Sequence, residues 1–218
     1  MEALRAALRA NVTAEMAVDP GHDLAHLDRV WVTVQAIAKA EGRGDIRVLL
    51  AAAYLHDLVN VPKNSPDRAN ASRMSAAAAA PVLAGLGFAD AEIAKAQHAI
   101  AAHSYSAALP VESIEAAILR DADRLDAIGA IGIARAFRVS AGLGQAIYDP
   151  GDPFAEGREL DDGPFAIDHW RIKLLGLRDG MLTDAGRAMA ETRLSFMQDY
   201  LRQLARELGR DLPENWLT

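Results

Sequence analysis

Cysteine is absent from this chain of 218 residues, which excludes both disulfide bonds and thiolate metal ligands. No apolar run reaches membrane-spanning length, and the run Val48–Tyr54 suits a buried helix instead. The N-terminus lacks a basic stretch followed by a long apolar core, so no secretory signal is visible. We therefore expect a soluble cytoplasmic protein with no membrane partner.

An excess of positive charge is also absent, because 30 acidic residues outnumber 23 basic ones and give a net charge of −7. This balance argues against a general polyanion-binding surface, so we expect no nucleic-acid partner, although a local basic pocket remains compatible. β-Branched residues dominate no window, whereas alanine and leucine are abundant and apolar residues recur at helical spacing. We predict an all-α, single-domain helical bundle over residues 1–218, with a core at about 20–140 and an additional C-terminal helical lobe at about 165–210 packed on it.

The most informative feature that is present is the adjacent pair His56-Asp57, at the end of the apolar run. Burying an ionised carboxylate costs several kcal/mol or more unless the carboxylate is paired or binds a metal. A lone histidine in an apolar helix is most often an ordinary core residue, so the pair alone is weak evidence. His26 lies thirty residues upstream, and Asp123 lies sixty-six residues downstream within an aspartate-rich segment. Taken together and in this order, these residues argue against a purely structural role.

At these residues the chain resembles the HD-domain metal-dependent phosphohydrolases, in which a separate His, an adjacent His-Asp pair and a later Asp bind a divalent metal. The segments Gly21–Val30, Asp121–Ile133 and Lys173–Leu175 resemble more narrowly the small bacterial subfamily called YedJ/YpgQ-like. The resemblance implies a helical bundle of the HD-domain type. It also implies four metal ligands: His26, His56, Asp57 and Asp123.

The same resemblance implies hydrolysis of (deoxy)nucleoside triphosphates to monophosphate and pyrophosphate. Mn²⁺ is the expected ion, with Co²⁺, Fe²⁺, Mg²⁺ and Zn²⁺ as alternatives, and a nucleotide is the expected small-molecule substrate. Two other functions stay open: a nucleoside monophosphatase with the same metal site, and a catalytically silent nucleotide-binding sensor. Asn60 keeps the sensor open, because several relatives outside the subfamily carry an acid/base Glu at this position and asparagine cannot take a proton.

Four further residues are candidate catalytic groups. Lys63 and Arg68 lie in a polar segment that follows the His-Asp pair. They are candidates for binding phosphates, and the alternative is that they are ordinary solvated charges. His103 ends a predicted helix and belongs to a segment that resembles one near the substrate in the subfamily. Asp126 lies one turn beyond Asp123, where it would orient water or meet a sugar hydroxyl.

Two aspartates compete for the role of the last metal ligand. Asp121 falls on the apolar stripe of residues 114–128, so periodicity alone nominates it as the buried acid. The resemblance instead places the ligand at Asp123. We therefore expect Asp121 to lie just outside the metal's own ligands, with Arg29 as its candidate partner.

The remaining pattern predicts helices at residues 2–18, 24–41, 45–59, 67–85, 90–103, 111–128 and 184–208. We expect His98 to be structural and His169 and Lys173 to add positive charge at the phosphate end of a pocket. The segment 142–164 is rich in Gly, Pro and Asp. We expect it to form a lid over the site, with a flexible loop that plays no part in the site as the alternative. The final helix has Thr183 as its expected N-cap and an apolar stripe for packing or for a homodimer. That stripe runs through Met189, Thr192, Phe196, Tyr200 and Leu204.

Overall fold

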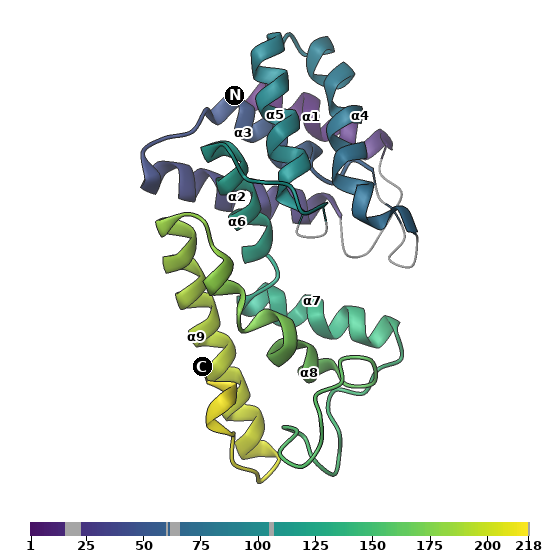
Figure 1. The fold of residues 1–218 in the computed structure, drawn as a ribbon, viewed down its shortest axis with the longest axis vertical. Coiled ribbons are helices and arrows are strands. Elements are labelled where there is room, and N and C mark those ends of the chain that lie inside the picture. The colour runs from purple at the N-terminus through teal and green to yellow at the C-terminus, as the bar shows by residue number, and fades with distance from the viewer. Residues whose placement is uncertain (16–22, 60, 62–65, 105–106, 218) are drawn as a thin grey trace. The chain divides into compact units, whose positions relative to one another are not determined.

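The helical class predicted from the sequence is confirmed by the computed structural model, in which the described residues form helices and no β-strand (Figure 1). Among these residues, no helix combines the length and the apolar character needed to span a bilayer. The chain divides into two compact units, Met1–Asp123 and Arg124–Thr218. The single-domain organisation stays a prediction. The structure describes residues 1–15, 23–59, 61, 66–104 and 107–217, without the side chains of Glu15, Pro66 and Arg68.

The first unit is built around helix α3 (Ile46–Leu55), which packs against four other helices. Every residue from Val48 to Leu55 is fully buried, which explains why this segment carries no charge. Around it lie α1 (Glu2–Glu15), α2 (Leu24–Glu41), α4 (Ala71–Gly85) and α5 (Asp90–His103). The unit also contains the short 3-10 helix η1 (Pro66–Asn70) and most of α6 (Ile114–Leu125).

The end of α3 differs from the prediction in a way that matters for the site. The helix begins after its N-cap Asp45, whose carboxylate accepts hydrogen bonds from the backbone N–H groups of Arg47 and Val48 at 2.9 and 3.3 Å. It ends at Leu55, whereas the sequence suggested that it continues to residue 59. His56 therefore lies at the C-cap, where the regular pattern of backbone hydrogen bonds within the helix ends.

A polar network joins α1, α2 and α3 at the fully buried Tyr54. The Tyr54 hydroxyl donates to Oδ1 of Asp28 at 2.5 Å and accepts from Nε of Arg5 at 2.8 Å. Arg9 also pairs with the Asp28 carboxylate. Partial burial raises the pKa of Asp28, but the hydrogen bonds from Arg9, Tyr54 and Arg5 outweigh it, so the pKa lies below its usual value. One carboxylate thus holds three helices together.

Helices α4 and α5 lie side by side, and this contact holds the C-terminal end of α5 in place (Figure 1). The hydroxyl of Ser72 on α4 donates to the carbonyl of Ala101 at 3.0 Å, and the amide of Gln97 on α5 donates to the carbonyl of Ala76 at 3.0 Å. Small residues line this contact, since Ala76 and Ala79 on α4 and Ala96 and Ala99 on α5 are buried. Two members of the alanine run at residues 76–80, Ala76 and Ala79, are thus buried on α4.

The second unit contains α7 (Gly129–Gly142), which packs against α8 (Ala166–His169) and α9 (Asp184–Glu207). Trp170 is fully buried, and its ring centroid lies 5.4 Å from that of Phe137 and 5.5 Å from that of Tyr200. The unit also contains the π-helix η3 (Trp170–Leu174) and the 3-10 helices η4 (Leu177–Gly180) and η5 (Glu214–Trp216).

The segment between α7 and α8 packs into the second unit. Phe154 is only 2% exposed, and the indole N–H of Trp216 donates to its carbonyl at 2.9 Å. Arg158 pairs with the fully buried Asp168 through both terminal nitrogens. These contacts argue against a loosely attached loop at residues 142–164, which was the alternative considered from the sequence. The role of this segment as a lid stays a prediction.

The stripe predicted on α9 is not the face that packs within the chain, whereas its alternative role in a homodimer stays a prediction. Phe196, which lies on the expected packing stripe, is 51% exposed. The face that packs is rotated by one residue, about 100° around the helix, and is rich in small residues that allow close approach. The predicted N-cap is correct, because Thr183 accepts a hydrogen bond from the backbone N–H of Gly186 at 2.9 Å. The buried residues are Gly186, Ala190, Leu194, Met197, Leu201 and Ala205.

The Tyr54 network gives a stability prediction. Tyr54→Phe removes the hydroxyl that bridges Asp28 and Arg5 while it keeps the buried ring. Because hydrogen bonds to charged groups contribute about 1.5–3 kcal/mol and Asp28 is partly solvated, we expect a loss of about 1–2 kcal/mol in the free energy of unfolding, measured by urea denaturation. Tyr148→Phe, at a half-buried tyrosine of the second unit, is the control. Equal stability of the two variants would show that the network contributes nothing.

Candidate metal centre

Two histidines and an aspartate from different parts of the first unit converge on one another. Nε2 of His26, on the first turn of α2, lies 3.4 Å from Nε2 of His56 and 3.4 Å from Oδ1 of Asp123. Nε2 of His56 lies 3.7 Å from the same oxygen of Asp123. The three ligand atoms form a compact group that could hold a metal ion.

A second group shares His56 with the first. Nε2 of His56 lies 3.6 Å from Oδ2 of Asp57, and Nε2 of His103 lies 3.7 Å from Oδ1 of Asp57. The ligand atoms of each group lie within 4.8 Å of one another. The structure thus brings together the four predicted metal ligands and adds His103 to them.

The ends of α3 and α5 fix the orientation of two of these imidazoles. Nδ1 of His56 lies 3.0 Å from the carbonyl oxygen of Ala53, and Nδ1 of His103 lies 2.6 Å from that of Ile100. Both carbonyls belong to the last turn of a helix, where the regular pattern of backbone hydrogen bonds within the helix ends. A carbonyl can only accept, so each Nδ1 carries the proton. Each Nε2 therefore points into the cluster, as in many metal-binding histidines.

The electrostatics of the cluster favour a positive charge at its centre. His26 and His56 are almost completely buried, whereas the side chains of Asp57 and Asp123 are 23% and 30% exposed to solvent. Burial lowers the pKa of His56, but the charge of Asp57 and the hydrogen bond with Asp123 raise it above its usual value. Burial raises the pKa of Asp123, but hydrogen bonds from His26 and His56 hold it well below its usual range.

His103 behaves differently from His56. Burial and the neighbouring His56 lower the pKa of His103, despite the opposing charges of Asp57 and Asp123. A neutral imidazole whose Nδ1 carries the proton presents a lone pair at Nε2. The set of imidazole nitrogens and carboxylate oxygens suits a divalent cation that accepts mixed ligands, such as manganese, iron, cobalt or zinc. The residues present therefore fit the divalent metal that the resemblance implies.

The other predicted site residues lie either outside the described residues or in the second unit. Lys63 and Asn60 lie outside the described residues, as does the side chain of Arg68, whose backbone belongs to η1. Asp126 lies in the second unit, where it is buried and paired with Arg135. The roles assigned to these residues stay predictions.

Asp121 and Asp123 have different environments. Periodicity predicted a buried Asp121, and the resemblance predicted Asp123 beside the histidines. Asp121 is fully buried, in agreement with its place on the apolar stripe of α6. Asp123 is the more exposed of the two and is the one whose carboxylate meets His26 and His56. The pairing of Asp121 with Arg29 stays a prediction.

Among the described residues, His98 and His169 contact groups outside this cluster. Nε2 of His98 accepts a hydrogen bond from the backbone N–H of Glu112 at 3.2 Å, in keeping with a structural role. Nδ1 of His169 and Nζ of Lys173 both contact Oδ2 of Asp162, at 2.9 and 2.6 Å. The positive charge expected from His169 and Lys173 is therefore offset locally by Asp162.

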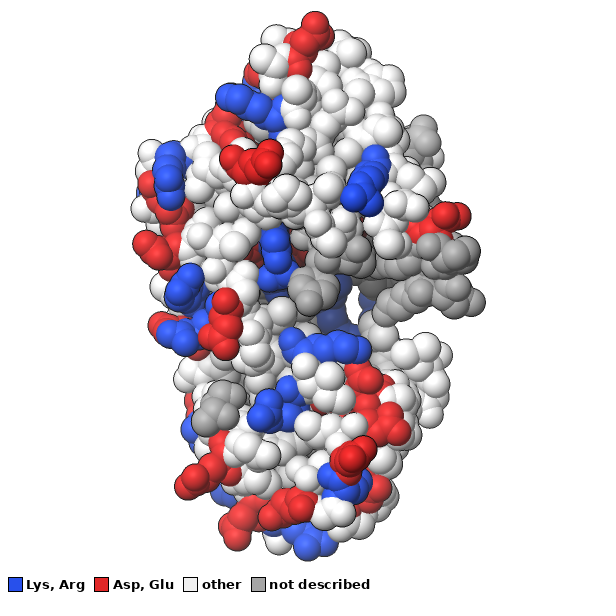
Figure 2. All heavy atoms as spheres, viewed as in Figure 1, with Lys and Arg blue, Asp and Glu red and all other residues white. Residues whose placement is uncertain are grey.

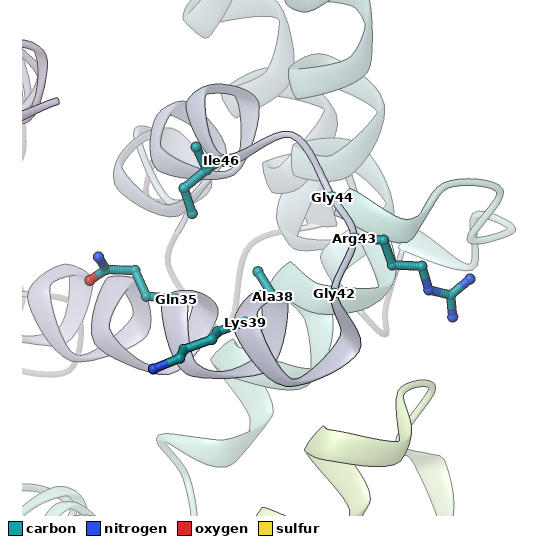
Figure 3. A pocket seen from close by; sticks show the side chains of 7 residues that line it. All are labelled: Gln35, Ala38, Lys39, Gly42, Arg43, Gly44 and Ile46. Atoms are coloured by element: carbon teal, nitrogen blue, oxygen red, sulfur yellow. The ribbon is translucent and has the colours of Figure 1, made fainter.

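A surface hollow of about 430 Å³ lies at the opposite end of α2 from His26 (Figure 3). Nine residues separate His26 from Gln35, the first lining residue, which is roughly 13 Å along a helix. Lys39 and Arg43 point in different directions there and do not converge on a common point (Figure 3). The hollow is therefore distinct from the His/Asp cluster and offers no comparable set of ligands.

The surface charges do not mark a second site on the face drawn in Figure 2. Lys and Arg side chains are interspersed there among Asp and Glu side chains. This mixture agrees with the acidic net charge of the sequence.

Comparison with known proteins identifies the family. The chain matches the model of the HD domain over residues 23–128. The uncharacterized protein YpgQ of Bacillus subtilis is 34% identical over 192 residues, which cover 86% of this chain and 85% of YpgQ. The crystal structure of Bacillus subtilis YpgQ in complex with ADP has a TM-score of 0.71 and 33% identity, covering 94% of this chain and 93% of that one. A Bacillus thuringiensis HD-superfamily hydrolase has a TM-score of 0.73 and 29% identity, covering 96% and 98%. The chain, with its His26, His56-Asp57 and Asp123 brought together, belongs to the HD-domain family.

Proposed function

We propose that this protein is a divalent-metal-dependent phosphohydrolase that cleaves (deoxy)nucleoside triphosphates to monophosphates and pyrophosphate. The observation that carries the proposal is the convergence of His26, His56, Asp57 and Asp123 on a small volume in the first unit. Hydrolysis as the reaction class is supported by membership of the HD-domain family and by the similar HD-superfamily hydrolase.

These four residues would hold the metal, for which we propose Mn²⁺. A bound divalent cation supplies polarisation of a phosphoryl oxygen and a lower pKa for a bound water. The protein's own contribution is orientation: the carbonyl of Ala53 holds the His56 ring, and the N-cap Asp23 accepts the backbone N–H of His26 at 2.9 Å. Asp57 and Asp123 are partly exposed, which would allow a substrate to reach the cluster.

A nucleotide is the proposed substrate because YpgQ, which is similar over most of this chain, has been crystallised with ADP. Lys63 and Arg68 follow the His-Asp pair in the chain and are proposed to neutralise charge on the phosphates. His103 faces Asp57 and is proposed to act in the active site. Asp126 is proposed to orient water or a sugar hydroxyl, and its partner Arg135 would hold its carboxylate in place.

The two aspartates of α6 give the sharpest test of the ligand set. Asp123→Ala removes a carboxylate that meets two imidazoles, so we expect the purified variant to contain no stoichiometric metal. Asp121→Ala removes a buried carboxylate outside the cluster, so we expect it to keep some metal and to lose stability or rate. Metal content measured by mass spectrometry distinguishes the two. A metal-free Asp121→Ala beside a metal-loaded Asp123→Ala would reverse the assignment.

The phosphate role of Lys63 is tested by kinetics on a triphosphate. Lys63→Ala should lower kcat/KM on the order of ten- to a hundredfold without a change in metal content, because a hydrogen bond to a charged group contributes about 1.5–3 kcal/mol. Lys63→Arg should recover part of the loss, since it keeps the charge and changes the reach. Unchanged kinetics in Lys63→Ala would make this residue an ordinary solvated lysine.

The reaction itself is tested by product identification. With Mn²⁺ present, a panel of nucleoside mono-, di- and triphosphates should give pyrophosphate from triphosphates, detected by phosphorus NMR. Orthophosphate released from monophosphates would instead identify a monophosphatase. Tight nucleotide binding without any product would identify a sensor.

A further inference from the structure

The place of the Asp57 carboxylate depends on the path of the backbone after α3. The ring of His56 is oriented within its own helix, because Nδ1 lies 3.0 Å from the carbonyl oxygen of Ala53. Asp57 lies one residue further, in the turn that follows the end of α3 at Leu55. A single methylene joins its carboxylate to the backbone, so whatever holds this turn also determines where the carboxylate lies.

Helix α4 holds this turn through a buried serine. The backbone N–H of Val59 donates to Oγ of Ser75 at 3.0 Å, and Ser75 is only 1% exposed. In a helix that continued past Leu55, the N–H of Val59 would bind the carbonyl of Leu55. That carbonyl accepts from the N–H of Leu58 at 3.3 Å. The bond to Ser75 thus ties the chain, two residues after Asp57, to a different helix.

A second buried serine, one turn earlier on α4, helps to hold this helix in place. Ser72 is 4% exposed, and its hydroxyl donates to the carbonyl of Ala101 on α5 at 3.0 Å. In the opposite direction, the amide of Gln97 on α5 donates to the carbonyl of Ala76 at 3.0 Å. Ser72 and Ser75 are three residues apart and share one face of α4. They bind two different neighbours, α5 and the turn after α3.

We propose that Ser75 is a positioning residue for the metal ligand Asp57 and acts on it through the backbone N–H of Val59. The proposal rests on the metal centre of the proposed function. Metal–ligand distances vary by only about 0.2 Å, so a small shift of the turn weakens the bond from the carboxylate to the metal. Groups that orient metal ligands from outside typically change metal affinity by about tenfold or more when they are removed.

The affinity of the full-length protein for Mn²⁺ tests this role without reference to activity. In titration calorimetry, Ser75→Ala should bind Mn²⁺ about tenfold more weakly than the wild type. Ser75→Cys keeps most of the side-chain volume but offers a weaker acceptor, so its affinity should be intermediate. Ser72→Ala is the matched control, because it removes a buried serine hydroxyl from the same helix and leaves the bond at Val59 intact. It should bind Mn²⁺ as the wild type does. Circular dichroism checks that the variants keep their helices.

Electron paramagnetic resonance of bound Mn²⁺ gives an independent readout, because the spectrum depends on how the ligands are arranged around the ion. It should change in Ser75→Ala and stay unchanged in Ser72→Ala. Wild-type affinity in folded Ser75→Ala would overturn the positioning role and leave the proposed function standing, as would equal weakening by Ser72→Ala. If Ser75→Ala does not fold, wild-type affinity in Ser75→Cys overturns the role in the same way. Binding of no Mn²⁺ by the wild type would overturn both proposals.

Discussion

The hydrogen bond between Nδ1 of His56 and the carbonyl of Ala53 is the interaction on which the rest of the site depends. It exists because α3 ends at Leu55, where the regular pattern of backbone hydrogen bonds within the helix stops. The imidazole pairs with the Ala53 carbonyl and in doing so directs Nε2 toward Asp57 and Asp123. The end of α3 thus determines how the His56 ring is oriented. The same arrangement recurs at the end of α5, where His103 contacts the carbonyl of Ile100.

This arrangement explains why charged groups are tolerated beside an apolar core. Burial disfavours a charge on either kind of side chain, yet the pKa of His56 is raised and that of Asp123 is lowered. Each shift shows that the neighbours stabilise the charged form more than burial opposes it. A second charged group beside the core, the Asp28 carboxylate, is stabilised by hydrogen bonds and ion pairs with Arg5, Arg9 and Tyr54.

The sequence predicted the fold class because helical spacing is a local pattern, whereas the four predicted metal ligands came from the resemblance to a known family. The predicted N-cap Thr183, for example, depends only on residues within one turn of it. Asp123 needed the resemblance, since helical spacing selects the buried Asp121 and cannot show that a half-exposed carboxylate faces two histidines. The convergence of His103 with Asp57 depends on how α5 packs on α3 and α4, which no single-helix pattern contains. The packing face of α9 was missed because three of its six buried residues are alanine or glycine, which carry a weaker apolar signal than the exposed Phe196.

The central claim is that the converging histidines and aspartates form a metal site. The most direct test is titration calorimetry of metal-free protein with Mn²⁺, comparing the wild type with His56→Ala and Asp57→Ala. The wild type should bind Mn²⁺ with release of protons, because imidazole ligands must be deprotonated to bind a metal. Both variants should keep their helices and lose the tight binding step. Equal affinity in the wild type and in folded His56→Ala would contradict the account.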